Sequence, residues 1–185
     1  MTARPTLRLA ALLAALPALL SAAHPVAQAT APATATATAT APATAPRFDP
    51  LRFFAGRTAG EGSFKVILRS TRSISVRGNG HVEPDGTLVL DQQVAEQGKP
   101  ERQRQWRIRA VSPGRYTGTL SDATGAVTGT AEGDTLRLAF PAKDGFQVEQ
   151  VLTLSPDGRS ADNLLVARRF GIAVARLRET IRRLD

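Results

Sequence analysis

The 185-residue sequence predicts an all-β protein, an up-and-down antiparallel barrel of about eight to ten strands. From residue 47 onward, short runs of alternating apolar and polar residues recur about every ten residues. Turn motifs rich in Pro, Gly, Asn and Asp separate these runs. No segment between the runs has the pattern of a helix, so a parallel sheet built from βαβ units is not expected. A β-sandwich is the alternative fold.

The N-terminal region has the pattern of an export signal. Arg4 and Arg8 supply positive charge, and the run of Ala and Leu that follows is too short for a comfortable membrane span. Small residues come next, with an A-x-A cleavage pattern at residues 27–29 and a second option at residues 21–23. An uncleaved anchor helix is the alternative. We predict a signal peptide over residues 1–29, and therefore a periplasmic or secreted protein.

A spacer separates this signal from the folded part. Residues 30–46 are almost entirely Ala, Thr and Pro. Such a segment has no large apolar group to offset the entropy of ordering, and its prolines oppose a helix. We predict a disordered, extended linker over residues 30–46 and a β-barrel domain over residues 47–185.

The predicted strands follow one another with short connections. They span residues 63–69, 73–77, 87–94, 103–111, 115–121, 125–131, 135–140, 145–154 and 161–170. The turns are predicted at Gly78-Asn79-Gly80, Pro84-Asp85-Gly86, Pro113-Gly114, Lys143-Asp144-Gly145 and Pro156-Asp157-Gly158. Gly and Asn suit these positions because they accept a positive φ. So many short strands favour a closed barrel, since closure removes the exposed sheet edges.

The C-terminal segment allows two interpretations. Residues 172–184 can form a further strand, or they can form a basic amphipathic helix with Val174, Leu177, Ile181 and Leu184 at helical spacing. We favour a strand with a frayed or helical end.

Composition excludes several kinds of chemistry. The chain has no Cys and two His, so it can form no disulfide, thiolate metal site or thiol nucleophile, and its folded part has only His81. A Ser/His/Asp triad requires a His that moves the proton, and no motif places a Ser beside His81. We therefore predict no catalytic residues, no metal ligands, no cofactor and no enzymatic activity. The net charge of +8 would suit an anionic partner, but the arginines are scattered over many segments, and a bias of coding composition towards Arg is the alternative explanation. The aromatic content of 5% is low for nucleic-acid binding.

One strand combines an arginine with the single tryptophan of the chain. Arg104 and Trp106 are two residues apart, so they share one face of the strand at residues 103–111. If that face points inward, Arg104 requires an acidic partner, for which Asp122 and Glu149 are the candidates, or an anionic ligand. Alternatively, Arg104 lies at the barrel mouth and packs its stem over Trp106. The predicted ligand-binding residues are Arg104, Trp106, Tyr116, Asp122 and Glu149.

A series of short motifs resembles a known family. They are Phe53-Phe54-Ala55-Gly56, Asp85-Gly86, Arg104-Gln105-Trp106, Tyr116-Thr117-Gly118-Thr119 and Phe170-Gly171, and they occur in this order over about residues 48 to 180. In these motifs the chain is similar to a bacterial envelope family known as domain-of-unknown-function family 3833. The resemblance implies an envelope location and a lipocalin-like (calycin-like) barrel. It implies no activity. Members carry a lipoprotein cysteine, which this chain lacks, so a lipid anchor is not implied.

Two function classes remain. The first is a non-enzymatic barrel that binds a small apolar or amphipathic ligand, because a barrel of this size can enclose one such molecule. The second is a structural or interaction module whose barrel is filled by its own side chains and whose surface contacts wall, membrane or protein. The expected partners are a small hydrophobic ligand and an anionic envelope surface. We expect no nucleic acid, and we expect a monomer.

Overall fold

The computed structural model describes residues 46–185. The predicted signal peptide, and the predicted linker apart from Pro46, lie outside the described residues. The elements are α1 (Pro50–Phe53), β1 (Gly56–Val66), β2 (Arg72–Val82), β3 (Leu88–Glu96), β4 (Arg102–Ser112), β5 (Arg115–Leu120), β6 (Val127–Glu132), β7 (Thr135–Ala142), a 3₁₀ turn (Lys143–Gly145), β8 (Phe146–Leu154), β9 (Ser160–Arg169) and β10 (Ile172–Arg183). No helix among residues 46–185 is long and apolar enough to cross a membrane.

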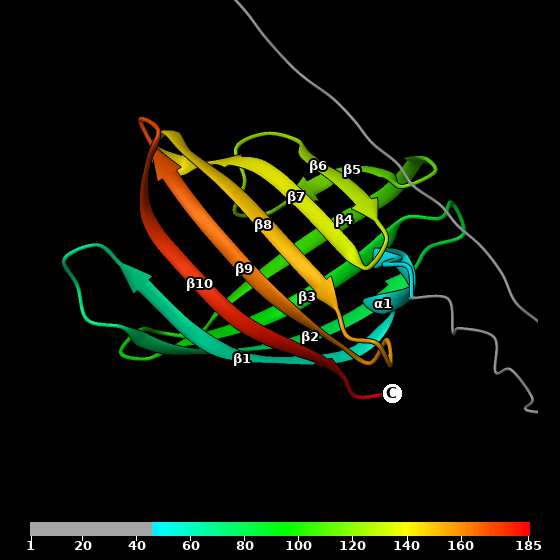
Figure 1. Cartoon of the computed structure of the whole chain (residues 1–185), viewed down its shortest axis with the longest axis horizontal. Coiled ribbons are helices and arrows are strands. Elements are labelled where there is room, and N and C mark those ends of the chain that lie inside the picture. Colours follow the sequence, from blue (N-terminus) through cyan, green and yellow to red (C-terminus); the bar gives the residue numbers. More distant parts are fainter. Residues whose placement is uncertain (1–45) are drawn as a thin grey trace, which may run out of the picture. The chain divides into compact units, whose positions relative to one another are not determined.

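The ten strands close into one antiparallel barrel. Each strand pairs with the next along the chain, and β1 also pairs with β10, which closes the ring (Figure 1). The register of the closing pair places Phe64 opposite Leu177 and Gly60 opposite Ile181. The predicted up-and-down barrel is therefore confirmed, and the sandwich alternative is wrong.

The connections agree with the predicted turns in four cases out of five. Gly86, Gly114, Gly145 and Gly158 all have a positive φ, as glycines in tight turns commonly do. The C-terminal segment is also settled. It forms strand β10 up to Arg183, so the strand interpretation is confirmed and the helical one is wrong.

The predicted turn at Gly78-Asn79-Gly80 is wrong, because β2 runs through it without a break. Both glycines point into the barrel at places where another group lies very close. A Cβ atom on Gly80 would lie 2.0 Å from the carbonyl oxygen of Phe54, and one on Gly78 would lie 2.4 Å from the hydroxyl of Thr58. These glycines therefore provide room inside the barrel rather than a change of chain direction.

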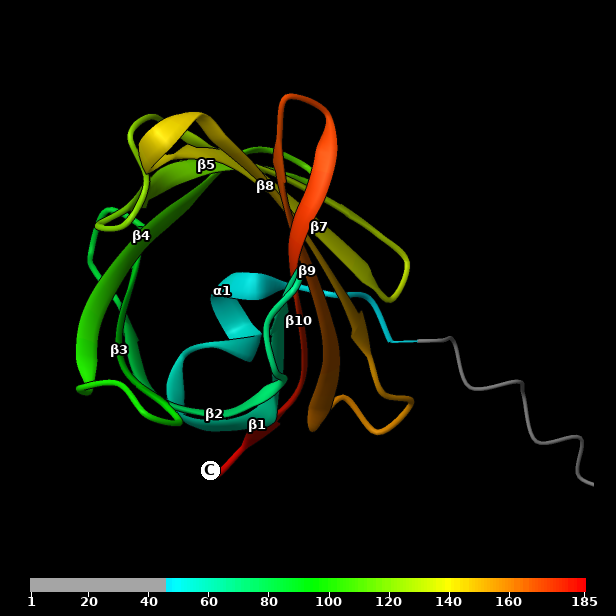
Figure 2. The ribbon, with the colours of Figure 1, turned by 90° about the vertical axis from the view of Figure 1, so that its left-hand side faces the viewer.

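A short segment before β1 closes one end of the barrel. The side chain of Asp49 caps α1 by accepting hydrogen bonds from the backbone N–H groups of Leu51 (3.0 Å) and Arg52 (3.4 Å). Phe53 packs against Phe48 and Phe54, with ring centroids 5.2 and 4.9 Å apart. The sequence did not predict this plug. Figure 2, which looks along the barrel, shows α1 within the ring of strands.

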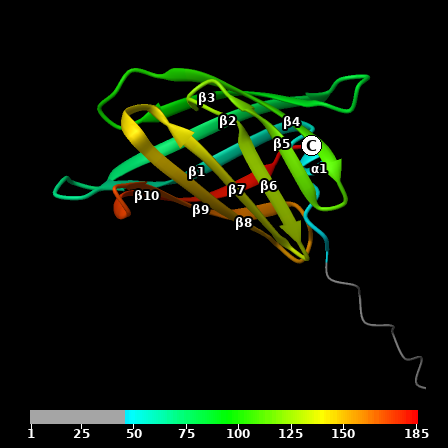
Figure 3. The same ribbon diagram turned by 90° about the horizontal axis from the view of Figure 1, so that it is seen from above.

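The opposite end of the barrel carries no such segment among the described residues. It is formed by the β1–β2, β3–β4, β5–β6, β7–β8 and β9–β10 connections, and Figure 3 shows it on the side away from α1. We call it the open end, and we call the end with α1 the plugged end.

Two apolar clusters lie inside the barrel. The larger one lies towards the plugged end and includes Leu88, Leu136 and Leu152, all with 0% exposure. The smaller one lies towards the open end between β1, β2, β3 and β10. Its buried members are Ile74, Val76, Val94 and Leu177, and half-buried Phe64 and Leu165 pack against it.

Candidate ligand site in the barrel interior

A belt of polar side chains lies inside the barrel, between the two apolar clusters. Its buried members are Thr58, Gln92, Gln150, Asn163 and Glu179. They occupy inward positions in strands whose other inward residues are apolar, as in β3, where Leu88, Leu90, Gln92 and Val94 alternate with outward residues. Buried polar groups cost free energy unless they are hydrogen-bonded, so the contacts of this belt decide what it can do.

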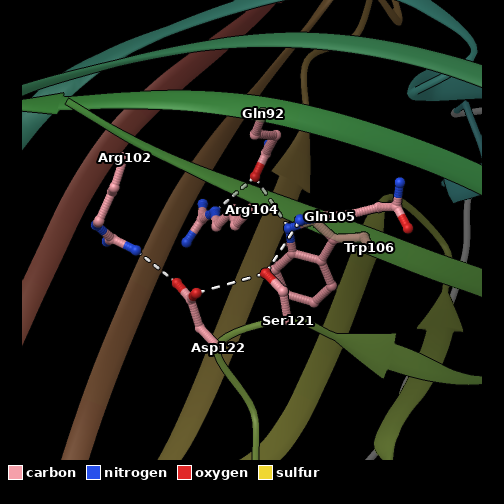
Figure 4. A network of polar contacts seen from close by, with 7 residues as sticks. All are labelled: Gln92, Arg102, Arg104, Gln105, Trp106, Ser121 and Asp122. Carbon is pink, nitrogen blue, oxygen red and sulfur yellow. Dashed lines mark hydrogen bonds and ion pairs between the residues drawn. The ribbon is translucent and has the colours of Figure 1, made fainter.

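Arg104 and Trp106 both point into the barrel and meet Gln92 from the neighbouring strand (Figure 4). The side-chain oxygen of Gln92 accepts one hydrogen bond from Nε of Arg104 (2.7 Å) and another from Nε1 of Trp106 (2.9 Å). The guanidinium carbon of Arg104 lies 5.7 Å from the centre of the Trp106 ring. Gln92 therefore fixes the orientation of both side chains.

The surroundings of Trp106 hold its ring in place. The ring meets Phe140 edge to face, with centroids 5.6 Å apart, and is almost fully buried. Such aromatic pairs add about 0.5–1.5 kcal/mol beyond their burial. The Trp106 ring therefore has a fixed position beside Arg104.

The guanidinium of Arg104 carries an incomplete set of contacts. Within residues 46–185, its two terminal nitrogens donate no hydrogen bond and form no ion pair. The pKa of Arg104 is lowered to about 10, first because burial removes water from the charge and then because Arg102 is nearby. The residue is deep in the barrel, yet it is only half-buried by solvent accessibility, so free space remains beside it.

An acidic residue lies in the same belt. Oε2 of Glu179 accepts a hydrogen bond from Nδ2 of Asn163 (3.0 Å), and burial raises the pKa of Glu179 despite this bond and the nearby Arg104. Gly60 provides the room, because a Cβ atom there would lie 1.9 Å from Oε1 of Glu179. Glu179 and Arg104 interact through space, but they form no ion pair in the described part of the chain. The belt therefore offers both donors and acceptors.

Further charges surround the open end and already have partners. Arg102 pairs with Asp122, whose second oxygen lies near the hydroxyl of Ser121. Arg72 pairs with Glu96 at 2.6 Å, and Lys99 approaches the same carboxylate at 3.2 Å. These pairs neutralise one another, which leaves Arg104 as the inward cation without an ion-pair partner among residues 46–185.

The predicted site residues do not all come together. Arg104 and Trp106 share the inward face, and Asp122 lies close enough to influence the charge of Arg104, although its ion pair is with Arg102. The suggested pairing of Arg104 with Glu149 is wrong. Glu149 points outward from β8, is 64% exposed and pairs with Arg168, because its alternation in β8 places it on the outer face.

Tyr116 also lies apart from Arg104. It packs, half-buried, against the larger cluster, and burial raises the pKa of its hydroxyl. The register places Tyr116 opposite Ala110 in β4, six positions beyond Arg104 along that strand, or roughly 20 Å at the usual rise per residue. Tyr116 therefore belongs to the plugged end.

The sequence did not point to Gln92, Asn163 and Glu179. The only available signal was a polar residue at an inward position of an apolar alternation, and that signal depends on knowing which face is inward. Within residues 46–185, no group of three or more His, Cys, Asp or Glu side chains could hold a metal ion. His81 is exposed on the outer face of β2.

Solved structures share this fold at low sequence identity. An S-type phycobiliprotein lyase from Guillardia theta matches with a TM-score of 0.57 and 10% identity, over 73% of this chain and 90% of that one. Rv2717c from M. tuberculosis matches with a TM-score of 0.56 and 18% identity, over 75% and 99% of the two chains. These are lipocalin-like, calycin-type barrels, and at these identities the likeness concerns the fold alone.

A third structure, a protein of unknown function from the DUF3598 family of Nostoc punctiforme, has a TM-score of 0.52 and 11% identity. The match covers 79% of this chain and 53% of that one. No curated protein matches the sequence. The family model described as a protein of unknown function (DUF3833) matches residues 29–183, which is most of the chain. This match shows that the chain, which forms a closed ten-stranded barrel, belongs to the DUF3833 family.

Proposed function

We propose that the barrel binds a small amphipathic ligand with an acidic group, and that Arg104 binds this group. The observation that carries the proposal is the state of the Arg104 guanidinium. Gln92 fixes its Nε, while its terminal nitrogens have no protein partner among residues 46–185. A guanidinium with two free, parallel N–H groups suits a carboxylate, sulfonate or phosphate oxygen pair.

The energetics of burial support this role. An arginine removed from water is costly unless an anion or strong acceptors compensate its charge, and burial already lowers the pKa of Arg104 to about 10. Glu179 does not form the missing ion pair, and its own pKa is raised by burial. A ligand anion would compensate the charge of Arg104, for which the described residues provide no ion-pair partner.

The layout of the interior supports an amphipathic molecule rather than a free inorganic anion. A ligand that enters through the open end meets the smaller apolar cluster around Ile74, Val94 and Leu177, and deeper in it reaches the polar belt. The ligand would place its acidic group at Arg104 and its apolar part along this cluster. Half-buried Phe64 and Leu165 offer further apolar surface.

We also propose that the protein acts as a non-enzymatic binder outside the cytoplasm, in the periplasm or secreted. The pattern of residues 1–29 supports this location. Fractionation of the native host with an antibody to the chain tests it. Recovery in the cytoplasmic fraction at full length would contradict the proposed location and leave the ligand site to its own test.

The ligand site can be tested with two matched fluorescent probes. 1-Anilinonaphthalene-8-sulfonate carries a sulfonate, and N-phenyl-1-naphthylamine has the same rings without the charge. Trp106 is the single Trp and lies beside Arg104, so energy transfer from Trp106 shows that a bound probe lies near it, and the effect of an Arg104 substitution then assigns the probe to this site. We expect Arg104→Met to weaken the affinity for the anionic probe about tenfold or more, equivalent to about 1.4 kcal/mol of binding free energy. The affinity for the neutral probe should change less than about twofold.

Arg107→Met is the matched control for this experiment. Arg107 lies on the same strand, points outward and pairs with Glu83 at 2.6 Å, so its loss should leave both probes unaffected. Equal binding of the anionic probe by the Arg104→Met variant and the parent chain would overturn the proposal, as would binding without energy transfer from Trp106. The structural or interaction module with a filled barrel would then be the better description.

A further inference from the structure

Exposed apolar side chains are concentrated at the open end of the barrel. Leu68 and Phe170 are 101% and 90% exposed, and Ile67 and Ile172 beside them are 50% and 64% exposed. Leu68 lies in the β1–β2 connection and Phe170 in the β9–β10 turn. We call these four residues the apolar rim. Large apolar residues gathered on protruding loops, outside any core, indicate an interaction surface.

The two hairpins that carry the rim are adjacent at their bases, and their tips diverge (Figures 1 and 2). Strand β1 pairs with β10 up to Val66 and Ala175, and the backbone N–H of Ile67 donates to the carbonyl oxygen of Val174 at 3.0 Å. Both hairpins project on the left of Figure 1, away from α1. The rim is therefore one edge of the barrel mouth and not two unrelated loops.

The backbone at the tips is unfavourable for the residues found there. Leu68 has a φ of 59° and Phe170 a φ of 50°, which is the left-handed region that bulky side chains rarely adopt. Gly171 also has a positive φ, so Phe170-Gly171 occupies the centre of a two-residue hairpin turn in which Asn-Gly is favoured. Neither burial nor backbone preference accounts for Leu68 and Phe170, which suggests that their exposed side chains serve binding.

The two chain segments that carry the rim hold charges of a single sign. Residues 65–72 and 168–176 contain six Lys or Arg residues and no Asp or Glu. Arg72 and Arg168 have acidic partners on neighbouring strands. The other four form no ion pair within residues 46–185, and they are Lys65, Arg69, Arg169 and Arg176.

We propose that the open end docks on the surface of an anionic lipid bilayer, with Leu68 and Phe170 inserted at the headgroup level. Apolar side chains at the centre with Lys and Arg around them fit this surface, because long basic side chains reach lipid phosphates while their stems stay in apolar surroundings. A protein partner is less suitable, since the cores of protein interfaces are depleted in charge. Docking depends on the rim and on the basic residues around it, and not on Arg104, so it stands or falls independently of the ligand proposed there.

The absence of cysteine from the chain allows a local test. In the full-length protein, Leu68→Cys, Phe170→Cys and Val111→Cys are labelled one at a time with the environment-sensitive dye NBD. Val111 is 54% exposed at the plugged end and is the control position. Vesicles contain phosphatidylcholine alone or a mixture with phosphatidylglycerol.

With the mixed vesicles, we expect NBD at positions 68 and 170 to shift to shorter wavelength and to brighten about twofold or more, while position 111 stays unchanged. With phosphatidylcholine alone the response should be much weaker. Dyes at 68 and 170 that stay water-exposed, even while the chain binds vesicles through another segment, would overturn the proposal. An equal response to both compositions would overturn the role of anionic lipid.

A pair of charge variants tests the basic residues directly. We expect Arg69→Gln combined with Arg176→Gln to weaken binding to the mixed vesicles about tenfold, because both arginines are exposed beside the rim. Arg109→Gln combined with Arg115→Gln removes the same charge at the plugged end and should change binding less than about twofold. Equal weakening by both pairs would mean that vesicle binding depends only on the net charge of the protein, which would contradict docking by the rim.

Discussion

The two ends of the barrel use the same architecture for different purposes. At the plugged end, α1 and the three phenylalanines of residues 48–54 cover the interior, and Leu88, Leu136 and Leu152 lose all contact with solvent. At the open end, Phe64 and Leu165 remain half-buried, although they also occupy inward positions of their strands. The difference arises because residues 48–54 cover only one end.

The polar belt lies at the boundary between these regions. Arg104, Gln92 and Glu179 are deep enough for burial to shift the pKa of both ionisable groups, but free space remains beside Arg104. The buried apolar residues of the plugged end stabilise the fold. The open end keeps polar and exposed side chains that do not contribute to a packed core. We therefore expect substitutions at the plugged end to change stability most, and substitutions at the open end to change binding.

The largest effect is expected from a cavity at the plugged end. Leu152→Ala removes a side chain with 0% exposure and should lower the free energy of unfolding by about 2–5 kcal/mol. Leu177→Ala, in the smaller cluster, should cost less because solvent and neighbouring side chains can occupy the space. Urea denaturation of both variants measures the difference. Equal losses would show that the two ends are packed alike.

A close backbone contact holds the plug against β2. Gly80→Ala would place a methyl group 2.0 Å from the carbonyl oxygen of Phe54, so α1 or β2 must move. We expect a loss of about 1–3 kcal/mol in thermal or urea unfolding. Ser75→Ala, at an outward position of the same strand, is the control. A neutral Gly80→Ala variant would mean that the plug is loosely seated.

The belt should produce a pH dependence. The folded pKa of Glu179 is raised, so its contribution to stability is complete below the unfolded value of 4.5 and is lost as the pH rises through the folded pKa. Glu179→Gln keeps an oxygen for Asn163 and removes this dependence. The variant should therefore gain stability relative to the parent chain as the pH rises from 4.5, measured by melting temperature across pH. Parallel curves would contradict burial of Glu179.

The smallest effect concerns a turn at the open end. Phe170→Asn places a favoured residue at a positive φ and should raise the free energy of unfolding by about 0.5–1 kcal/mol. The same variant should bind anionic vesicles less well. Improved stability together with reduced docking would show that Phe170 contributes to vesicle binding and not to the stability of the fold. A clear loss of stability would show that Phe170 supports the barrel.

The fold could be predicted because alternation and turn residues are local signals. The predicted strands correspond to observed strands, and four predicted turns occur where expected. The error at Gly78-Asn79-Gly80 has a long-range cause, because these glycines make room for Thr58 and Phe54, which lie far away in the chain. The same holds for α1, which is too short to show a helical period.

Of the candidate site, the sequence predicted only the two residues that lie close together on one strand, Arg104 and Trp106. The spacing of Arg104 and Trp106 placed both on one face, and that face is inward. Their actual partner, Gln92, comes from the adjacent strand, and only the β3–β4 register brings it opposite Arg104. Glu149 was a wrong candidate because a carboxylate in a strand gives no sign of the face on which it lies.

The sequence by itself determined the all-β class, the succession of strands and the absence of thiol chemistry, because two-residue periodicity and composition are properties of the chain alone. The tertiary structure decided which end is covered, which polar residues meet in the interior and which charges remain without partners. These depend on register and closure, which bring residues as distant as Gly60 and Glu179 into contact. No local pattern carries that information.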